Sequence, residues 1–171
     1  EQNFKITPQQ LAAAITPRTK AIILCSPSNP TGSVYSLEEL EGLAEVLRQY
    51  PEVLVIADEI YEHINYVGKH ASIATLPDMQ ERTAIINGVS KAYAMTGWRI
   101  GFVAAPLALA KAVNKLQGQY TSGAGSISQK ASVAAFNGDQ APVEEMRQAF
   151  LRRKNLICLL YTSDAADDMQ C

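Results

Sequence analysis

The sequence predicts an α/β fold: a mostly parallel sheet with one antiparallel strand and helices on both faces. Two short apolar runs, Ala21–Cys25 and Val53–Ala57, have the composition of strands that are buried on both faces. An amphipathic helical segment lies between them, and this order makes a parallel strand pair with a right-handed crossover. The chain has 171 residues, which is enough for one domain with its own core.

The predicted helices carry start and stop signals. Thr7 stands before Pro8, an arrangement that is typical of a helix N-terminus. Ser36 and Glu39 have the spacing of a capping box, and leucines repeat behind them on one helical face until Pro51 ends the helix. Three later helices are expected, over about 106–119, 127–136 and 142–160.

Polar residues stand where the predicted strands end. Two further strands are expected over 83–89 and 99–104. Asn29 follows the first strand, Asp58 ends the second and Lys91 follows the third, and ligands bind outside the carboxyl ends of parallel strands. Arg99 comes only eight residues after Lys91, which leaves the chain little room to cross the sheet. An antiparallel fourth strand therefore brings Arg99 to the same edge.

These side chains match the chemical groups of pyridoxal phosphate. An acid at the end of a buried strand, such as Asp58, can keep a cationic ring nitrogen protonated. The amine of Lys91 can form an imine with an aldehyde, and Arg99 can bind a phosphate through two parallel hydrogen bonds. Tyr61 and Asn29 can hydrogen-bond a phenolic oxygen. The set therefore predicts a binding crevice for this cofactor.

The chain contains three characteristic strings: SPSNPTG at 26–32, ADEIY at 57–61 and SKAYAMTGWRIG at 90–101. Together they resemble the fold-type I pyridoxal phosphate-dependent aminotransferases of class I/II, in particular the bacterial aspartate and aromatic amino acid aminotransferases. Their order and spacing agree with that family from about Phe4 to Leu156. The resemblance implies transamination of an amino acid, aspartate or aromatic, with a 2-oxo acid, in a cytoplasmic homodimer.

The resemblance also implies a role for each residue of the crevice. Lys91 is the catalytic residue and carries the cofactor as a Schiff base, and Asp58 pairs with the pyridine nitrogen. Tyr61 and Asn29 hydrogen-bond the 3-oxygen of the cofactor. Asn29 also touches the carboxylate of the substrate, and Arg99 binds the phosphate.

One phosphate contact departs from the family pattern. Some relatives carry a phosphate-binding serine three residues before the lysine, where this chain has Gly88. Ser90 or the backbone is the candidate for that contact here. The resemblance further implies that the small-residue loop 121–126 lies near the active site or a subunit interface, and a cis peptide bond before Pro30 fits the same loop motif.

Composition excludes several other classes of function. The 15 basic and 17 acidic residues give a net charge of −2 and show no basic run, so no nucleic-acid partner is expected. No apolar run approaches the length of a membrane span. The three cysteines are an odd number without metal-ligand spacing, which indicates a reducing compartment such as the cytoplasm. His63 and His70 lie in predicted loops without a ligand pattern, so no metal site is expected.

Two alternatives remain open at this stage. The pair Asp58-Glu59 after an apolar strand is also typical of the Walker B strand of a nucleotide hydrolase, although the chain has no GxxxxGK[ST] motif to hold phosphates. The other alternative is a non-catalytic, truncated domain that only binds the cofactor or a partner.

The ends of the chain predict its domain organisation. Residues 1–160 are expected to form a partial pyridoxal phosphate-binding large domain that runs into the start of a missing small domain, and to be inactive alone. Residues 161–171 are expected to be a non-native tail, because they lack periodicity and carry three aspartates within five residues.

Overall fold

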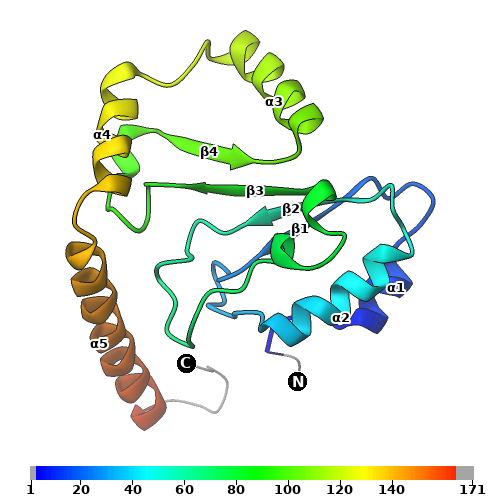
Figure 1. Cartoon of the computed structure of the whole chain (residues 1–171). Helices are drawn as coiled ribbons and strands as arrows, with labels where there is room; N and C mark the ends of the chain where they lie inside the picture. Colours follow the sequence, from blue (N-terminus) through cyan, green and yellow to red (C-terminus); the bar gives the residue numbers. More distant parts are fainter. Residues whose placement is uncertain (1–2, 165–171) are drawn as a thin grey trace.

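The computed structural model describes residues 3–164 and centres on a four-stranded sheet of order β1-β2-β3-β4 (Figure 1). β1 (Ala21–Cys25), β2 (Leu54–Asp58) and β3 (Thr83–Gly88) run parallel to one another. β4 (Gly101–Ala104) pairs antiparallel with β3. The predicted fold class, a mostly parallel sheet with one antiparallel strand and surrounding helices, is confirmed.

Two helices, α1 (Pro8–Ala14) and α2 (Leu37–Arg48), enclose the core on one face of the sheet (Figure 1). Thr7 caps α1 and Ser36 caps α2 through capping boxes, so the predicted start signals are confirmed. The core contains apolar side chains from both helices, the strands and the segment before β3, among them Leu11, Leu24, Leu40, Leu43, Leu47, Val53, Val55, Ala57, Ile73 and Met79. Each of its buried leucine, valine, isoleucine and methionine side chains contributes roughly 1.5–3 kcal/mol.

The opposite face of the sheet is more exposed. Ile23 in β1 is 73% exposed, and Leu54 in β2 and Ile86 in β3 are 37% and 38% exposed. Successive side chains of a strand point to opposite faces of the sheet. One set of alternate residues therefore packs under α1 and α2, and the other set lies on the opposite face. The expected burial of β1 and β2 on both faces is therefore seen on one face within residues 3–164.

The start of β3 is joined to the end of α2 by a buried arginine. Arg82 closes the short 3₁₀ turn η2 (Gln80–Arg82) and is 7% exposed. Its guanidinium donates to the carbonyl oxygens of Leu47 at 2.7 Å and Val53 at 3.0 Å, and also to that of Tyr50. These contacts satisfy the carbonyls where the chain leaves α2 and enters β2.

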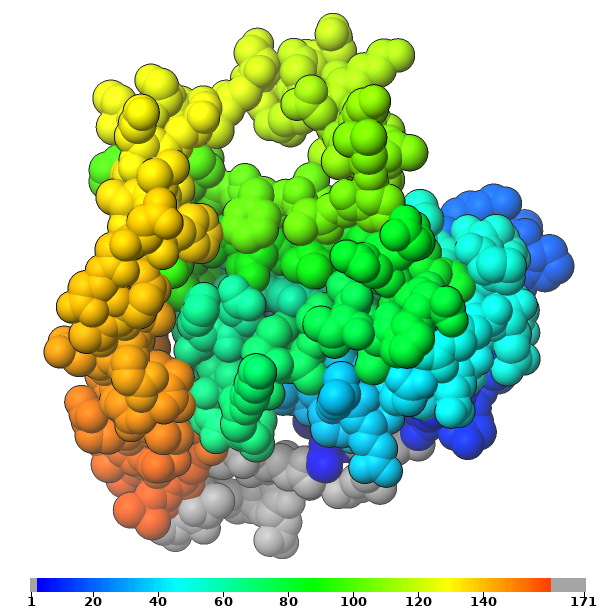
Figure 2. All heavy atoms as spheres, viewed as in Figure 1, coloured from blue at the N-terminus to red at the C-terminus, as the bar shows by residue number. Residues whose placement is uncertain are grey.

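Three further helices extend beyond this core. η3 (Thr96–Trp98) leads into β4, and α3 (Leu107–Tyr120) and α4 (Ser126–Asn137) then form an arch that leaves an open gap beside β4 (Figure 2). Phe136 ties α4 back to the sheet by edge-on ring contacts with Tyr93 and Phe102, at centroid distances of 5.5 and 5.8 Å. The helices stand close to their predicted positions.

The last helix, α5 (Ala141–Asp164), runs past residue 160, where the helical pattern was expected to end. The expected non-native tail begins at 161, and its residues 165–171 lie outside the described part of the chain. Arg147 joins α5 to the loop after β2 by a hydrogen bond of 3.2 Å to the carbonyl oxygen of Asn65. Among the described helices, none is long and apolar enough to cross a membrane.

Candidate active site

Three of the predicted site residues come together at the carboxyl ends of β1 and β2. The amide of Asn29, in the loop after β1, donates a 3.0 Å hydrogen bond to the hydroxyl of Tyr61, which follows β2. The amine of Lys91, which follows β3, lies 5.5 Å from the centre of the Tyr61 ring. These three side chains therefore meet at the predicted edge, where the parallel strands have their carboxyl ends.

The loop that carries Asn29 is shaped by its own backbone. The peptide bonds before Pro27 and Pro30 are cis, and the second of these agrees with the sequence-based expectation. Gly32 adopts a φ of +71°, which side chains disfavour, and its N–H donates to the carbonyl of Ser28 at 2.8 Å. The loop thus presents Asn29 from a defined turn.

The remaining predicted residues line a cavity of about 330 Å³ at the same edge. Asp58, Ser90 and Arg99 all contribute to it, together with Asn87 and the backbone around Gly101. Because β4 runs antiparallel to β3, the start of β4 returns to the edge where β2 and β3 end. The structure therefore places Arg99 at the same edge as Asp58, in the lining of one cavity.

The cavity lining contains an acidic and a basic side chain with different hydrogen-bond partners. Asp58 is half-buried, and its carboxylate accepts a 3.2 Å hydrogen bond from the backbone N–H of Ile60. Arg99 is exposed, has a φ of +54°, and donates to the carbonyl of Thr96 at 2.9 Å. The carboxylate can pair with a cationic ligand group, whereas the guanidinium and the Ser90 hydroxyl can bind an anionic one.

Gly88 has a packing role at the position where some relatives carry serine. A Cβ atom on Gly88 would lie 2.9 Å from the Cα of Gly101 and 3.1 Å from the carbonyl oxygen of Ile100. These two backbone atoms belong to the turn into β4 and cannot move as a flexible side chain can. Glycine at 88 therefore lets β4 approach β3, and Ser90 is the serine that lines the cavity.

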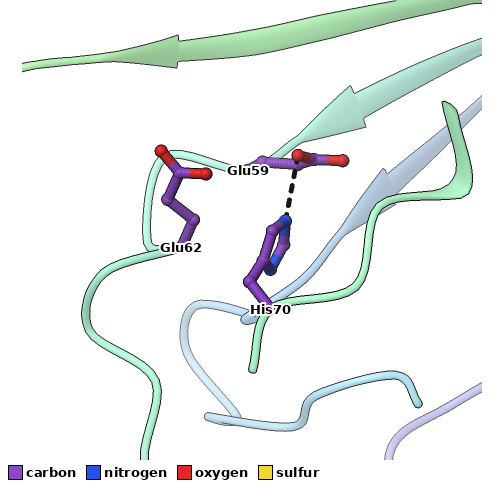
Figure 3. Close-up of side chains that lie close together, drawn as sticks. All are labelled: Glu59, Glu62 and His70. Carbon is purple, nitrogen blue, oxygen red and sulfur yellow. Dashed lines mark hydrogen bonds and ion pairs between the residues drawn. The ribbon is translucent and has the colours of Figure 1, made fainter. Parts of the chain in front are cut away.

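A cluster that sequence reasoning missed lies directly behind this edge (Figure 3). Glu59 is 6% exposed, and its carboxylate oxygens lie 2.9 Å from the His70 Nε2 and 2.6 Å from the Ser72 hydroxyl. Glu62 offers a third ligand-type atom within 4.8 Å. The sequence shows no ligand pattern around His70, yet a loop of irregular structure brings it to the Glu59 carboxylate, and no periodic pattern signals such a return.

The mixed sheet, with a lysine, an aspartate, an asparagine–tyrosine pair and an arginine at one edge, has the architecture of a class of aminotransferases. The chain belongs to the family described as aminotransferase class I and II, whose pattern matches residues 1–163. It is 56% identical over 160 residues to an aspartate aminotransferase of Geobacillus stearothermophilus, covering 92% of this chain and 40% of that relative. It is 50% identical over 159 residues to an aspartate/prephenate aminotransferase of Nitrosomonas europaea, with 92% and 40% covered.

Solved structures agree with the sequence relatives. The crystal structure of the aspartate aminotransferase from Rhizobium meliloti superposes with a TM-score of 0.88 at 47% identity, covering 90% of this chain and 39% of that one. The chain thus spans about 40% of the length of the curated relatives it matches. Membership of this family does not favour the nucleotide-hydrolase alternative for Asp58 and Glu59.

Proposed function

We propose that this chain is part of a pyridoxal phosphate-dependent aminotransferase that acts on an amino acid and a 2-oxo acid. The observation that carries the proposal is the meeting of Asn29, Tyr61 and Lys91 beside the cavity of Asp58 and Arg99. The names of the relatives, aspartate and aspartate/prephenate aminotransferase, support aspartate as the amino donor. Aromatic donors are the second candidate and rest on the motif resemblance.

The residues present fit the groups of pyridoxal phosphate one by one. The Asp58 carboxylate would face the ring nitrogen and keep it protonated, which is the state in which the bound cofactor supplies an electron sink for charge at the substrate Cα. Arg99 and Ser90 would hold the phosphate, since both line the same cavity as Asp58. Tyr61 and Asn29 would bind the 3-oxygen, and Asn29 would also orient the substrate carboxylate.

Lys91 would do the proton chemistry. Its amine would hold the cofactor covalently at rest and, when displaced by the substrate, would take the proton from the substrate Cα and return it. The Tyr61 ring, 5.5 Å from the amine nitrogen, would stabilise that nitrogen when it carries the proton. The Tyr61 hydroxyl is oriented in turn by Asn29.

The proposal extends to the organisation of the whole enzyme. Residues 1–160 would be an incomplete large domain without turnover of its own, continued by a small domain, and residues 161–171 a non-native tail. Exposed apolar side chains on α3 and α4, among them Leu107, Tyr120 and Ile127, support contact with further chain, including a second subunit of a homodimer. A cytoplasmic location is supported by Cys25, which is a free thiol.

The first test traps the cofactor on the chain. The purified chain is incubated with pyridoxal phosphate, reduced with borohydride and digested, and the modified lysine is identified by mass spectrometry. A dominant adduct on Lys91 that is lost in Lys91→Ala and kept in Lys111→Ala, a lysine on the exposed side of α3, supports the proposal. Scattered labelling of surface lysines would contradict formation of the site by this chain.

The second test uses the whole enzyme and compares reaction classes. Formation of oxaloacetate from aspartate and a 2-oxo acid is measured alongside hydrolysis of ATP. We expect transamination that Lys91→Ala reduces by at least 10⁴-fold, a loss in the range for removal of an essential proton-transfer group. ATP hydrolysis without transamination would establish the hydrolase alternative instead.

A further inference from the structure

The cluster of Glu59, His70 and Ser72 lies on the far side of the sheet edge from the cofactor cavity. Asp58 and Glu59 are neighbours, and adjacent residues at a strand end point to opposite sides. Asp58 accordingly lines the cavity of about 330 Å³ with Arg99, whereas Glu59 lines a separate hollow on the α2 side. The two acidic side chains therefore have different surroundings and different partners.

Glu59 connects three segments of the chain. Its backbone N–H donates to the carbonyl of Ile86 in β3 at 3.0 Å, and its carbonyl accepts from Glu62 at 2.9 Å. Its carboxylate contacts the returning segment at Ser72, at 2.6 Å. It also contacts that segment at His70, at 2.9 Å (Figure 3). The Glu59 side chain thus connects the start of the loop that bears Tyr61 to the segment of His70 and Ser72.

The returning segment provides a fixed support. Ser72 accepts at its hydroxyl from the N–H of Ala74 at 3.3 Å, and so caps the short turn η1 (Ile73–Thr75). Ile73, the next residue, is 2% exposed and belongs to the core. The position of the Ser72 hydroxyl is therefore set by core packing, and Glu59 transmits that position to the strand end.

Stability alone gives a weak reason for a buried carboxylate at this place. Removing a charge from water has a free-energy cost, and a buried ionic group can often be replaced by an apolar side chain without loss of stability. However, when both carboxylate oxygens are hydrogen-bonded, the side chain of Glu59 can take only one orientation. This fixes the path of the backbone between Asp58 and Tyr61. Asp58 directly precedes Glu59 and Tyr61 follows it by two residues, and both carry proposed cofactor contacts.

We infer that Glu59 is a positioning residue for the cofactor site, holding Asp58 and Tyr61 in place through its hydrogen bonds to His70 and Ser72. The inference rests on the proposed function, since it assigns a role toward pyridoxal phosphate. It predicts that the loss of these hydrogen bonds changes cofactor binding while the fold persists.

The test uses four variants of the whole enzyme. Glu59→Leu removes both hydrogen bonds while keeping a side chain of similar volume. Glu59→Gln keeps an amide oxygen that can accept from Ser72 and an amide group that can hydrogen-bond with His70. Ser72→Ala removes one donor, and Glu62→Gln is the matched control at a carboxylate that neither His70 nor Ser72 binds within the described residues. Pyridoxal phosphate dissociation constants and the pH midpoint of the absorbance of the bound cofactor are measured for each, with circular dichroism as the check of folding.

We expect Glu59→Leu to weaken cofactor binding at least tenfold and to shift the absorbance midpoint. Ser72→Ala should weaken cofactor binding about threefold, which corresponds to part of the free energy of one hydrogen bond. Glu59→Gln and Glu62→Gln should stay within twofold of wild type. If Glu59→Leu does not fold, the Ser72→Ala result decides.

Two results would overturn the inference. One is a folded Glu59→Leu variant with wild-type affinity and absorbance, and the other is a Glu59→Gln variant as impaired as Glu59→Leu, which would assign the effect to charge. Borohydride trapping of the wild type separates this failure from failure of the proposed function. A wild type without a Lys91 adduct refutes the aminotransferase proposal itself, whereas an adduct with unaffected variants refutes only the role of Glu59.

Discussion

The amide of Asn29 donates a hydrogen bond of 3.0 Å to the hydroxyl of Tyr61 across 32 residues of sequence. The bond joins the loop after β1 to the turn after β2, and these two strands are hydrogen-bonded neighbours in the sheet. The amine of Lys91 lies against the face of the same tyrosine ring. Two polar residues from separate loops are therefore oriented as one unit before any ligand is considered.

The coupling of this pair can be measured. Asn29→Ala and Tyr61→Phe should each weaken pyridoxal phosphate binding to the whole enzyme by about tenfold, the value of one hydrogen bond of about 1.4 kcal/mol. The double variant should lose less than the product of the two effects, because both changes break one shared interaction.

Absorbance titration with the cofactor checks this prediction. Tyr50→Phe is the control and should bind as the wild type does, because Tyr50 lies at the amino end of β2, opposite the carboxyl edge of the sheet. Two independent losses that multiply in the double variant would mean that Asn29 and Tyr61 act separately.

The contact of Gly88 with Gly101 predicts an effect on stability. Gly88→Ala should lower the free energy of unfolding by about 1–3 kcal/mol, since its methyl group would meet fixed backbone of the turn into β4. Gly118→Ala, in α3 with open space around it, should raise the free energy by about 0.5–1 kcal/mol.

Urea unfolding at one protein concentration compares the two variants, so that association does not contribute to the difference. Equal stability of Gly88→Ala and wild type would mean that β4 can move away from β3 without lowering the free energy of unfolding.

Arg82 predicts a second effect on stability. Its guanidinium satisfies the carbonyls of Leu47 and Val53, and burial lowers its pKa. Arg82→Met retains most of the apolar volume and leaves these buried carbonyls without their donor, so the free energy of unfolding should fall by about 2–4 kcal/mol.

The control for this change is Arg152→Met on the exposed side of α5, where the expected change is within about 0.5 kcal/mol. Both variants are compared by urea unfolding. If Arg82→Met lowers the free energy of unfolding no more than Arg152→Met does, the junction between α2 and β2 is stabilised by apolar packing alone.

The ion pair between Lys5 and Glu39 predicts a dependence on pH. Burial raises the pKa of Glu39, but hydrogen bonds from the Lys5 amine and the Ser36 backbone outweigh it, so the pKa lies below the ordinary value of 4.5. The folded state therefore binds this proton less readily than the unfolded state does. The ionised Glu39 carboxylate therefore stabilises the folded state above pH 4.5. This stabilisation is lost as the pH falls through the lower, folded-state pKa of Glu39.

Glu39→Gln should therefore be less stable than wild type at pH 7, and the difference should shrink toward pH 3. Unfolding curves at both pH values check this, with Glu38→Gln on the exposed face of α2 as the control. A difference that stays constant over this range would show that the carboxylate charge at position 39 does not contribute.

Local sequence patterns predicted most of the fold. The capping signals at Thr7 and Ser36 and the apolar strand runs act over a few residues, so the elements they specify can be identified without neighbours. The short connection from Lys91 to Arg99 predicted an antiparallel β4, which the sheet confirms. The Glu59–His70 contact spans 11 residues of irregular loop, and no period connects them.

The sequence by itself predicted the strands and their mostly parallel directions, the capped helices and the set of candidate residues Asn29, Asp58, Tyr61, Lys91 and Arg99. These follow from periodicity, chain length between elements and side-chain chemistry, all of which are local properties. Only the tertiary structure decided that Asn29 binds Tyr61, that Gly88 meets Gly101 and that Glu59 is held from behind. Such contacts depend on how separate segments pack in space, because a hydrogen bond or a steric limit arises only when atoms distant along the chain come within a few ångströms of each other.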